Sequence, residues 1–361
     1  MFYLKGIHMS SWTTTLKTPV RAIALLASVV AAASAVQAQT KTIYIGMNGG
    51  NMERTYSQFV FPAFEKANNV KVVVVPGTST DILAKAQASK DKAQMQVMTL
   101  DDGVMYRAIS MGLCEKLKPA ASYGDIPAIA KIKDSAIGLS MGLTGLAYNT
   151  KMFADKGWAA PTSWNDLADP KLKGKVVVQS MPASSFGLHA FLMFNRLKGG
   201  TEKNVDPAFK AWPTTIGPNV VEYIPNSSKV VEMMQAGDAA IFPYTLTQAE
   251  LMKSKGIPME YVAPKEGAVV LMTAMCVLNN NPESDLAQKL VEYLVSREAQ
   301  ALAMENGSYN PVNPKTKLQG KPAEEQNKMN AILKNAVAVD WDVVNADRPE
   351  WNKRWNRTVE R

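Results

Sequence analysis

The sequence has 361 residues, 47% of them hydrophobic, and its 40 lysines and arginines against 32 acidic residues give a formal net charge of +8. The charges are spread along the chain, and without a basic block or a known motif they argue against a nucleic-acid-binding protein. One of the two histidines, His8, falls in the predicted signal peptide at residues 1–38, which leaves His189 alone and excludes a multi-histidine metal site; two cysteines without a CxxC motif make a zinc site unexpected. We therefore expect a soluble globular protein without metal or cofactor.

Residues 1–38 have the pattern of a secretory signal peptide. Lys17 and Arg21 precede an uncharged apolar run from Ala22 to Ala33, and Val36-Gln37-Ala38 offers small residues at the cleavage position. The run is shorter than the roughly 20 residues of a membrane-spanning helix, so a retained anchor is less favoured. We expect cleavage of this segment and a mature chain in the periplasm.

The part that follows is long enough for two domains, and its first section alternates strands and helices. Strands are predicted at Lys41–Met47, Val70–Val75 and Gln94–Leu100, each followed by a polar turn and a helix. This alternation predicts a doubly wound parallel sheet. Ligands bind such sheets at the carboxyl ends of the strands, which is where all three polar turns fall.

The stretch from Pro161 to Val178 marks the opening of a second domain. Ser163 is placed to cap a short helix together with Asp166, and Asp169-Pro170 ends that helix. The apolar run Val176–Val178 is typical of a strand buried on both faces of a parallel sheet. Further strand and helix units follow it, so the second domain is again α/β.

Two extended apolar segments are suited to cross between the domains. Gly142–Asn149 leads into the second domain, and Ala268–Leu278 returns from it. The sequence thus predicts an α/β protein of two lobes, each built on a doubly wound, mainly parallel sheet. The predicted bounds are residues 39–145 with 268–320 for lobe I, 146–267 for lobe II, and 321–361 for a helical C-terminal segment that packs on the lobes through Trp341, Trp351 and Trp355.

Cys114 and Cys276 are both in the exported part of the chain and both fall in predicted lobe I. Their even number permits a disulfide in an oxidising compartment. Two buried small apolar side chains are an equally open alternative. Because neither cysteine belongs to a CxxC motif or has a visible histidine partner, we do not expect a catalytic thiol.

Several passages resemble one family in the order in which that family has them. They are Phe61–Gly77, Thr144–Phe153, Pro161–Val178, Ala263–Val270 and Pro282–Gln300. Together they resemble the extracellular solute-binding proteins of ABC importers, in the branch that includes spermidine/putrescine and ferric-iron receptors. The resemblance implies a type II periplasmic-binding-protein fold with hinge closure around a small-molecule ligand. It also implies a monomer that does no chemistry and delivers its ligand to an inner-membrane permease and its ATPase; whether the chain also feeds a sensor stays open.

The sequence departs from these relatives where they hold their ligands. Polyamine receptors have acidic residues in two places where this chain has Met181–Phe186 and Leu271–Thr273, and iron receptors have paired tyrosines where it has Tyr244-Thr245. A dication would lack its carboxylates, and a ferric ion would lack its phenolate pair. Asp101 and Asp102 keep a polyamine open as the alternative ligand, although either residue can simply cap the next helix.

Hydroxyl and backbone donors at predicted helix starts favour a different ligand. Helix N-termini carry free N–H groups and partial positive charge, which suit carboxylates, phosphonates and phosphates. We expect a small organic anion or zwitterion, such as a carboxylate or a phosphonate, with two tyrosines as aromatic walls; plain helix caps are the alternative for each hydroxyl. The predicted ligand-binding residues are Asn48, Gly49, Gly50, Ser79, Thr80, Asp101, Asp102, Tyr148, Ser184, Ser185, Tyr244 and Thr245.

An exported α/β hydrolytic enzyme is the competing class of function. The chain has no GxSxG or GxxxxGK[ST] motif, and its Asn48-Gly49-Gly50 loop matches GxGxxG poorly. His189 lies in an apolar helical run with no visible partner, which indicates a buried histidine more than a catalytic one. We therefore expect binding without turnover and predict no catalytic residue.

Overall fold

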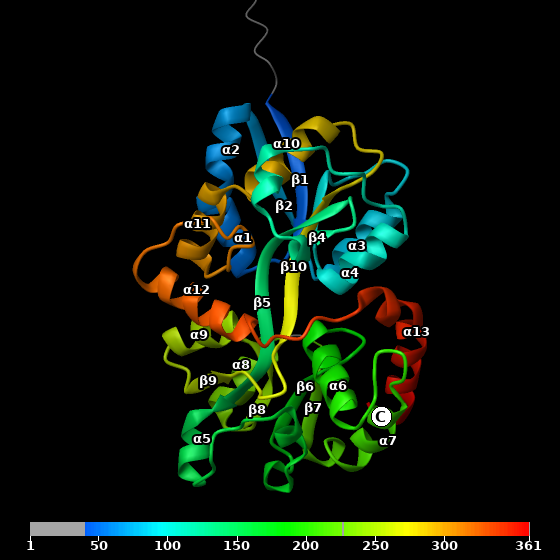
Figure 1. Ribbon diagram of the computed structural model, residues 1–361, viewed down its shortest axis with the longest axis vertical. Helices are drawn as coiled ribbons and strands as arrows, with labels where there is room; N and C mark the ends of the chain where they lie inside the picture. The colour runs from blue at the N-terminus through cyan, green and yellow to red at the C-terminus, as the bar shows by residue number, and fades with distance from the viewer. Residues whose placement is uncertain (1–39, 226, 361) are drawn as a thin grey trace, which may run out of the picture. The chain divides into compact units, whose positions relative to one another are not determined.

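One mixed sheet runs through the part of the chain that this computed structural model describes, residues 40–225 and 227–360 (Figure 1). Its strand order is β2-β1-β3-β10-β5-β8-β6-β7, and β4 and β9 pair with β5 off this path. The strands are β1 (Lys41–Met47), β2 (Val70–Pro76), β3 (Val97–Asp101), β4 (Lys131–Ile132), β5 (Ala136–Asn149), β6 (Val176–Gln179), β7 (Val220–Ile224), β8 (Ile241–Thr245), β9 (Met259–Val262) and β10 (Val269–Val277). The predicted signal peptide lies outside the described residues.

Helices cover both groups of strands (Figure 1). In the first lobe and the C-terminal part these are α1 (Asn51–Thr55), α2 (Phe61–Asn68), α3 (Ser79–Ala88), α4 (Asp102–Ser110), α10 (Ser284–Leu294), α11 (Arg297–Gly307), α12 (Gly320–Leu333) and α13 (Trp341–Thr358). In the second lobe they are α5 (Thr150–Asp155), α6 (Ser185–Leu197), α7 (Asp206–Ala211), α8 (Ser228–Ala236) and α9 (Leu246–Ser254).

The first lobe has the predicted strand and helix alternation. β1 pairs in parallel with both β2 and β3, and each of these strands leads into a helix. Thr78 caps α3 through a capping box with Asp81, which fixes the first turn of that helix at the carboxyl end of the sheet. The third strand begins at Val97, three residues after the predicted Gln94.

The second lobe also follows the prediction. Ser163 and Asp166 form the predicted capping box of a short 3₁₀ helix, Trp164–Ala168, and all four residues of β6 are buried between the helices on either face. β6 pairs in parallel with β7 and β8. The lobe's core is an aromatic cluster in which Phe191 packs against Trp212 and Trp355.

β5 and β10 are the predicted crossing strands, and they run side by side through the middle of the sheet (Figure 1). Residues 137–144 of β5 pair with β10, and residues 144–149 continue beside β8 and β9. Because these strands run antiparallel to β3 and β8, the sheet is mixed, although β1 is parallel to β2 and β3 in the first lobe and β6 is parallel to β7 and β8 in the second. The exact lobe bounds given above stay predictions.

The C-terminal segment is helical and packs on both lobes. α12 and α13 lie on opposite sides of the crossing strands (Figure 1), and the link between them passes over β10, where Val337 N–H donates to Ala268 O at 2.8 Å. Trp341 packs on Gly103 at the start of α4 in the first lobe. Trp355 belongs to the aromatic core of the second lobe, so α13 is fastened at both of its ends.

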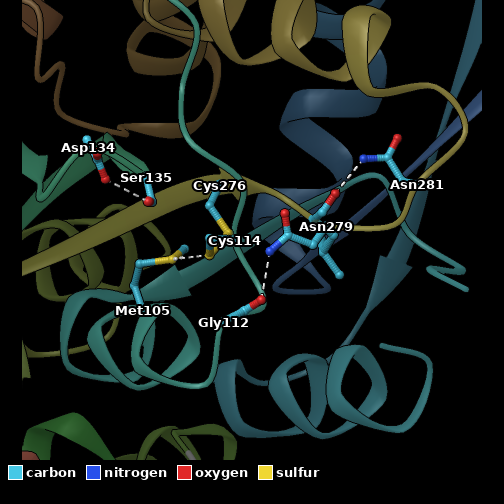
Figure 2. Close-up of a disulfide and its surroundings, with 9 residues drawn as sticks. Met105, Gly112, Cys114, Asp134, Ser135, Cys276, Asn279 and Asn281 are labelled. Carbon is cyan, nitrogen blue, oxygen red and sulfur yellow. Dashed lines mark hydrogen bonds between the residues drawn. A yellow bond between two sulfur atoms is a disulfide. The ribbon is translucent and has the colours of Figure 1, made fainter. Parts of the chain in front are cut away.

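Cys114 and Cys276 form a disulfide in the first lobe (Figure 2). Their Cα atoms are 5.7 Å apart, and the bridge closes a sequence separation of 162 residues. It joins the segment after α4 to the end of β10, next to the hydrogen bond from Asn279 Nδ2 to Gly112 O at 2.7 Å. Closing so long a loop removes conformational freedom mainly from the unfolded chain.

Gly187 allows α6 to start directly over the end of β6. A Cβ at this position would lie 1.9 Å from the Gln179 carbonyl oxygen. We predict that Gly187→Ala lowers the free energy of unfolding by about 1–3 kcal/mol, because backbone atoms cannot move aside cheaply. Urea unfolding measures it, with Gly124→Ala as the control, because a Cβ at Gly124 meets no atom within 4 Å. Equal stability of the two variants would contradict this packing.

Candidate functional site

A cavity of about 400 Å³ lies between the two lobes. The carboxyl ends of β1 and β3 and the start of α3 form its first-lobe side, and the starts of α6 and α9 form its second-lobe side. The middle of the crossing strands contributes Ser140, Gly142 and Thr273. This is the volume of a small-molecule site, and it is where a parallel sheet is expected to hold one.

Eight of the twelve predicted ligand-binding residues line this cavity. They come from the ends of five separate strands that the fold brings together, as expected for residues at the carboxyl ends of strands. They are Asn48, Gly49, Ser79, Thr80, Asp101, Ser184, Ser185 and Thr245.

The two predicted aromatic walls are not in the cavity lining. Tyr148 follows Gly142 by six residues along β5, which is about 20 Å of extended chain, and its ring packs on Phe153. Tyr244 is buried between Phe186 and Phe242, and this burial raises its pKa to about 12. The structure therefore does not bring the two tyrosines to this cavity, because strand patterns indicate that both residues are extended but not which face or end they occupy.

Gly50 and Asp102 are also outside the lining. Gly50 adopts a positive φ of 70° in the turn after β1 and serves only to reverse the chain into α1. Asp102 follows Asp101 but is buried on the other side, where its Oδ1 accepts from Gly103 N–H at 3.0 Å. Adjacent side chains at a strand end point in opposite directions, so only one of the two aspartates reaches the ligand space.

The hydroxyl protons of Ser184 and Ser185 are used within the protein. Ser184 caps α6 and donates to Gln179 Oε1 at 2.9 Å, while Ser185 donates to Asp101 Oδ2 at 2.8 Å. A hydroxyl has a single proton, so neither serine can donate to an anion while these bonds persist. Both predicted serines line the cavity, but Ser184 caps α6 and Ser185 forms a contact between the lobes, so neither donates to the ligand space.

Arg348 is the basic residue among the described residues that line the cavity, and it is not among the predicted ligand-binding residues. It lies on α13, is only 6% exposed, and lines the cavity. Its guanidinium makes no hydrogen bond or ion pair with any described residue. Burial and the nearby Arg107 lower its pKa to about 10, so the side chain remains a cation at neutral pH.

The signal for Arg348 was present in the sequence. Trp341, Val344, Arg348, Trp351 and Trp355 recur every three or four residues and form the buried face of α13. An arginine within such an apolar stripe is placed where lysines and arginines are almost never found without a partner. The three tryptophans were read as anchors, and the arginine between them was overlooked.

Three helices begin at the cavity and add to its positive side. Residues of the first turn of α3, α6 and α9 line it, with Thr78, Ser184 and Thr245 as the N-caps of these helices. Each helix start carries partial positive charge. Among the described lining residues, Asp101 is the one acidic side chain and Arg348 the one basic side chain. The arrangement suits a small ligand that carries an anionic group.

His189 does not belong to the lining. It is fully buried, its Nδ1 lies 2.9 Å from Thr144 Oγ1, and burial together with Arg348 lowers its pKa to about 3. A histidine held neutral in the core is not a base for a cavity substrate. Over residues 40–225 and 227–360, no cluster of three or more histidine, cysteine or acidic side chains could hold a metal, and no helix is long and apolar enough to span a membrane.

The comparison with known proteins agrees with this geometry. The family model described as bacterial extracellular solute-binding protein matches residues 60–333. The chain belongs to this family. It is the solute-binding component of an ABC transporter, with a small-molecule ligand that it delivers to a permease, and its two-lobed fold is that of periplasmic binding proteins.

Two proteins of known sequence and one solved structure are similar to this chain. A γ-aminobutyric acid-binding protein of Pseudomonas aeruginosa is 24% identical and covers 91% of this chain and 93% of its own. A Salmonella typhimurium periplasmic protein to which 2-aminoethylphosphonate binding is provisionally attributed is 22% identical over 87% of this chain and 90% of its own. The structure of AfuA from Actinobacillus pleuropneumoniae with bound fructose-6-phosphate has a TM-score of 0.74 and 24% identity, covering 89% of this chain and 98% of that one.

The buried Asp102 predicts a pH dependence of stability in this solute-binding protein. Burial, followed by the charge of Asp101, raises its pKa to about 7, although the Trp341 side chain favours the ionised form. Its unfolded pKa is about 3.9, so between pH 4 and 7 the native state holds the extra proton. Stability should then fall with rising pH, by up to about 1.4 kcal/mol per unit from this group.

Asp102→Asn should remove that contribution, because the amide cannot ionise. Urea unfolding of both proteins at pH 4.5, 6 and 7.5 is expected to show the wild type losing stability relative to the variant as pH rises. Parallel curves would mean that Asp102 has no raised pKa in the native state.

Proposed function

We propose that this solute-binding protein captures a small organic anion or zwitterion, such as a carboxylate or a phosphonate. The observation that carries this proposal is Arg348, a buried cation that lines the cavity and forms no hydrogen bond or ion pair with residues 40–225 or 227–360. A buried unpaired charge is costly, and a planar guanidinium pairs well with a carboxylate or phosphonate through two parallel hydrogen bonds. An anionic group of the ligand would supply the missing partner.

The surroundings of Arg348 support the same class of ligand. The starts of α3, α6 and α9 favour negative charge, and Thr245 and Thr247 add hydroxyls at the start of α9. The named ligands of the three similar proteins also fit, because 2-aminoethylphosphonate, γ-aminobutyric acid and fructose-6-phosphate each carry an anionic group.

A polyamine or a ferric ion suits this cavity poorly. Asp101 is the one carboxylate among the described lining residues, and Arg348 would repel a second ammonium group. The tyrosine expected for iron, Tyr244, is buried against Phe242 and followed by a threonine. Neither a dication nor a hard trivalent cation would gain enough oxygen ligands.

The remaining parts of the role are proposals of the same kind. We infer that the chain binds its solute without turnover, since the buried neutral His189 is not placed to act on a cavity ligand. We infer that residues 1–38 direct export to the periplasm and that the mature protein acts as a monomer without nucleic acid. Turnover of a bound solute would instead favour the exported hydrolytic enzyme.

Arg348→Gln tests the anion site with two measurements on ligand-stripped, refolded protein. We predict that the variant binds anionic solutes about 10- to 100-fold more weakly by calorimetry, as expected for losing a charge-assisted hydrogen-bond pair. We also predict that its ligand-free form is at least as stable as the wild type, because a buried unpaired cation has been removed.

Arg354→Gln is the matched control on the same helix. Arg354 pairs with Asp206 at the surface and stacks on the Phe209 ring, outside the cavity lining. This variant should keep full affinity. Unchanged affinity in Arg348→Gln would contradict the proposed function.

A further inference from the structure

Two opposite charges face the same cavity without forming an ion pair. Asp101 ends β3 in the first lobe and Arg348 lies on α13, and both line the cavity. The two are near enough to influence each other's ionisation, yet no salt bridge joins them among the described residues. Each group loses hydration on folding, and no ion pair with another described residue compensates that loss, which costs stability.

The carboxylate of Asp101 is surrounded mainly by neutral groups. Ser185 Oγ donates to Oδ2 at 2.8 Å, and the Asp101 N–H donates to Ser79 Oγ at 3.0 Å. Burial raises the pKa of this carboxyl, because the two serines and Arg348 compensate the lost hydration only in part. The buried neighbour Asp102 is itself an acid and cannot act as a counter-charge for Asp101. A cation beside Asp101 would therefore stabilise the ionised carboxylate.

We propose that Asp101 binds a positively charged group of the solute, so that the ligand is a zwitterion with its acid group on Arg348 and its ammonium group on Asp101. The inference rests on the proposed function, since it takes Arg348 as the anion site. The cavity of about 400 Å³ has room for a short chain between the two groups. A dication that spans the two residues would place one ammonium group beside the like charge of Arg348, and a dianion would place one acid group beside the carboxylate of Asp101. A zwitterion gives each residue a group of opposite charge.

The position of Asp101 links ligand charge to the contact between the lobes. Its carboxylate belongs to the first lobe, and the hydroxyl that it accepts belongs to the start of α6 in the second. A carboxylate can accept several hydrogen bonds, so a ligand ammonium can join without displacing Ser185. Bound zwitterion would then add a second contact to the carboxylate at which the lobes already meet.

The test compares solutes that differ only in the ammonium group. The probes are 2-aminoethylphosphonate against ethylphosphonate and 4-aminobutyrate against butyrate, with putrescine as the dication. Calorimetry on refolded, ligand-stripped protein is expected to show that the amine-bearing member of a pair binds about 10- to 100-fold more tightly, the usual effect of a hydrogen bond to a charged group.

Asp101→Asn assigns that preference to one residue. The amide keeps an oxygen for the Ser185 hydroxyl but has no charge, so the preference for the amine should fall to near unity while the anion alone keeps its affinity. Asp102→Asn makes the same chemical change one residue away, outside the lining, and should keep the preference. If Asp101→Asn does not fold, the affinities of the wild-type protein for the two solutes of each pair decide whether the site prefers a zwitterion.

The outcomes separate the two proposals. Equal binding of both members of each pair, or a preference that survives in Asp101→Asn, would overturn the zwitterion inference and leave the anion site intact. Binding of putrescine alone, or of none of the probes, would overturn both.

Discussion

The antiparallel pairing of β5 with β10 connects the two lobes and forms the centre of the cavity wall. It joins two parallel half-sheets that would otherwise be separate domains, and it contributes Ser140, Gly142 and Thr273 to the lining. Because the crossing strands enter between the carboxyl ends of the lobes' own strands, the turns of both lobes face each other across one space. The site follows from this topology: residues from the ends of five strands converge although no sequence motif unites them.

The C-terminal segment completes the site. The link between α12 and α13 adds a third stretch of chain to the crossing, with Val337 bonded to Ala268 beside β10. α13 is then fastened by Trp341 on the first lobe and Trp355 in the second. This anchoring holds Arg348 at the cavity, and packing on both sides keeps its charge from reaching bulk water. The fold thus holds a buried cation, without an ion pair to any residue that the structure describes, at a place where a ligand can bind it.

The fold was predictable because its signals are local. Capping residues such as Thr78 and Ser163, and the buried valines of β6, specify their elements from a few neighbouring residues. The convergence of the turns was predictable from the general rule for parallel sheets. Each turn can be placed at the carboxyl end of its strand without knowledge of the opposite lobe. This explains why eight of the predicted residues line the cavity.

The predicted site differs from the cavity lining at residues whose side-chain direction a local sequence pattern does not determine. Tyr148 and Tyr244 were assigned to extended strands, but their side chains pack against Phe153 and Phe242 because of contacts distant in the sequence. Asp101 and Asp102 are adjacent and chemically identical, and only the end of β3 decides that one faces the ligand space. Arg348 was detectable as a charge in the apolar stripe of α13, yet its place at the cavity depends on docking of that helix against both lobes.

A crystal structure with a bound zwitterionic solute tests the central claim most directly. We predict the acid group within about 2.7–3.2 Å of the Arg348 guanidinium and the ammonium group within that distance of Asp101. An acid group held only by hydroxyls and helix N–H groups, with Arg348 still unpaired, would contradict the account.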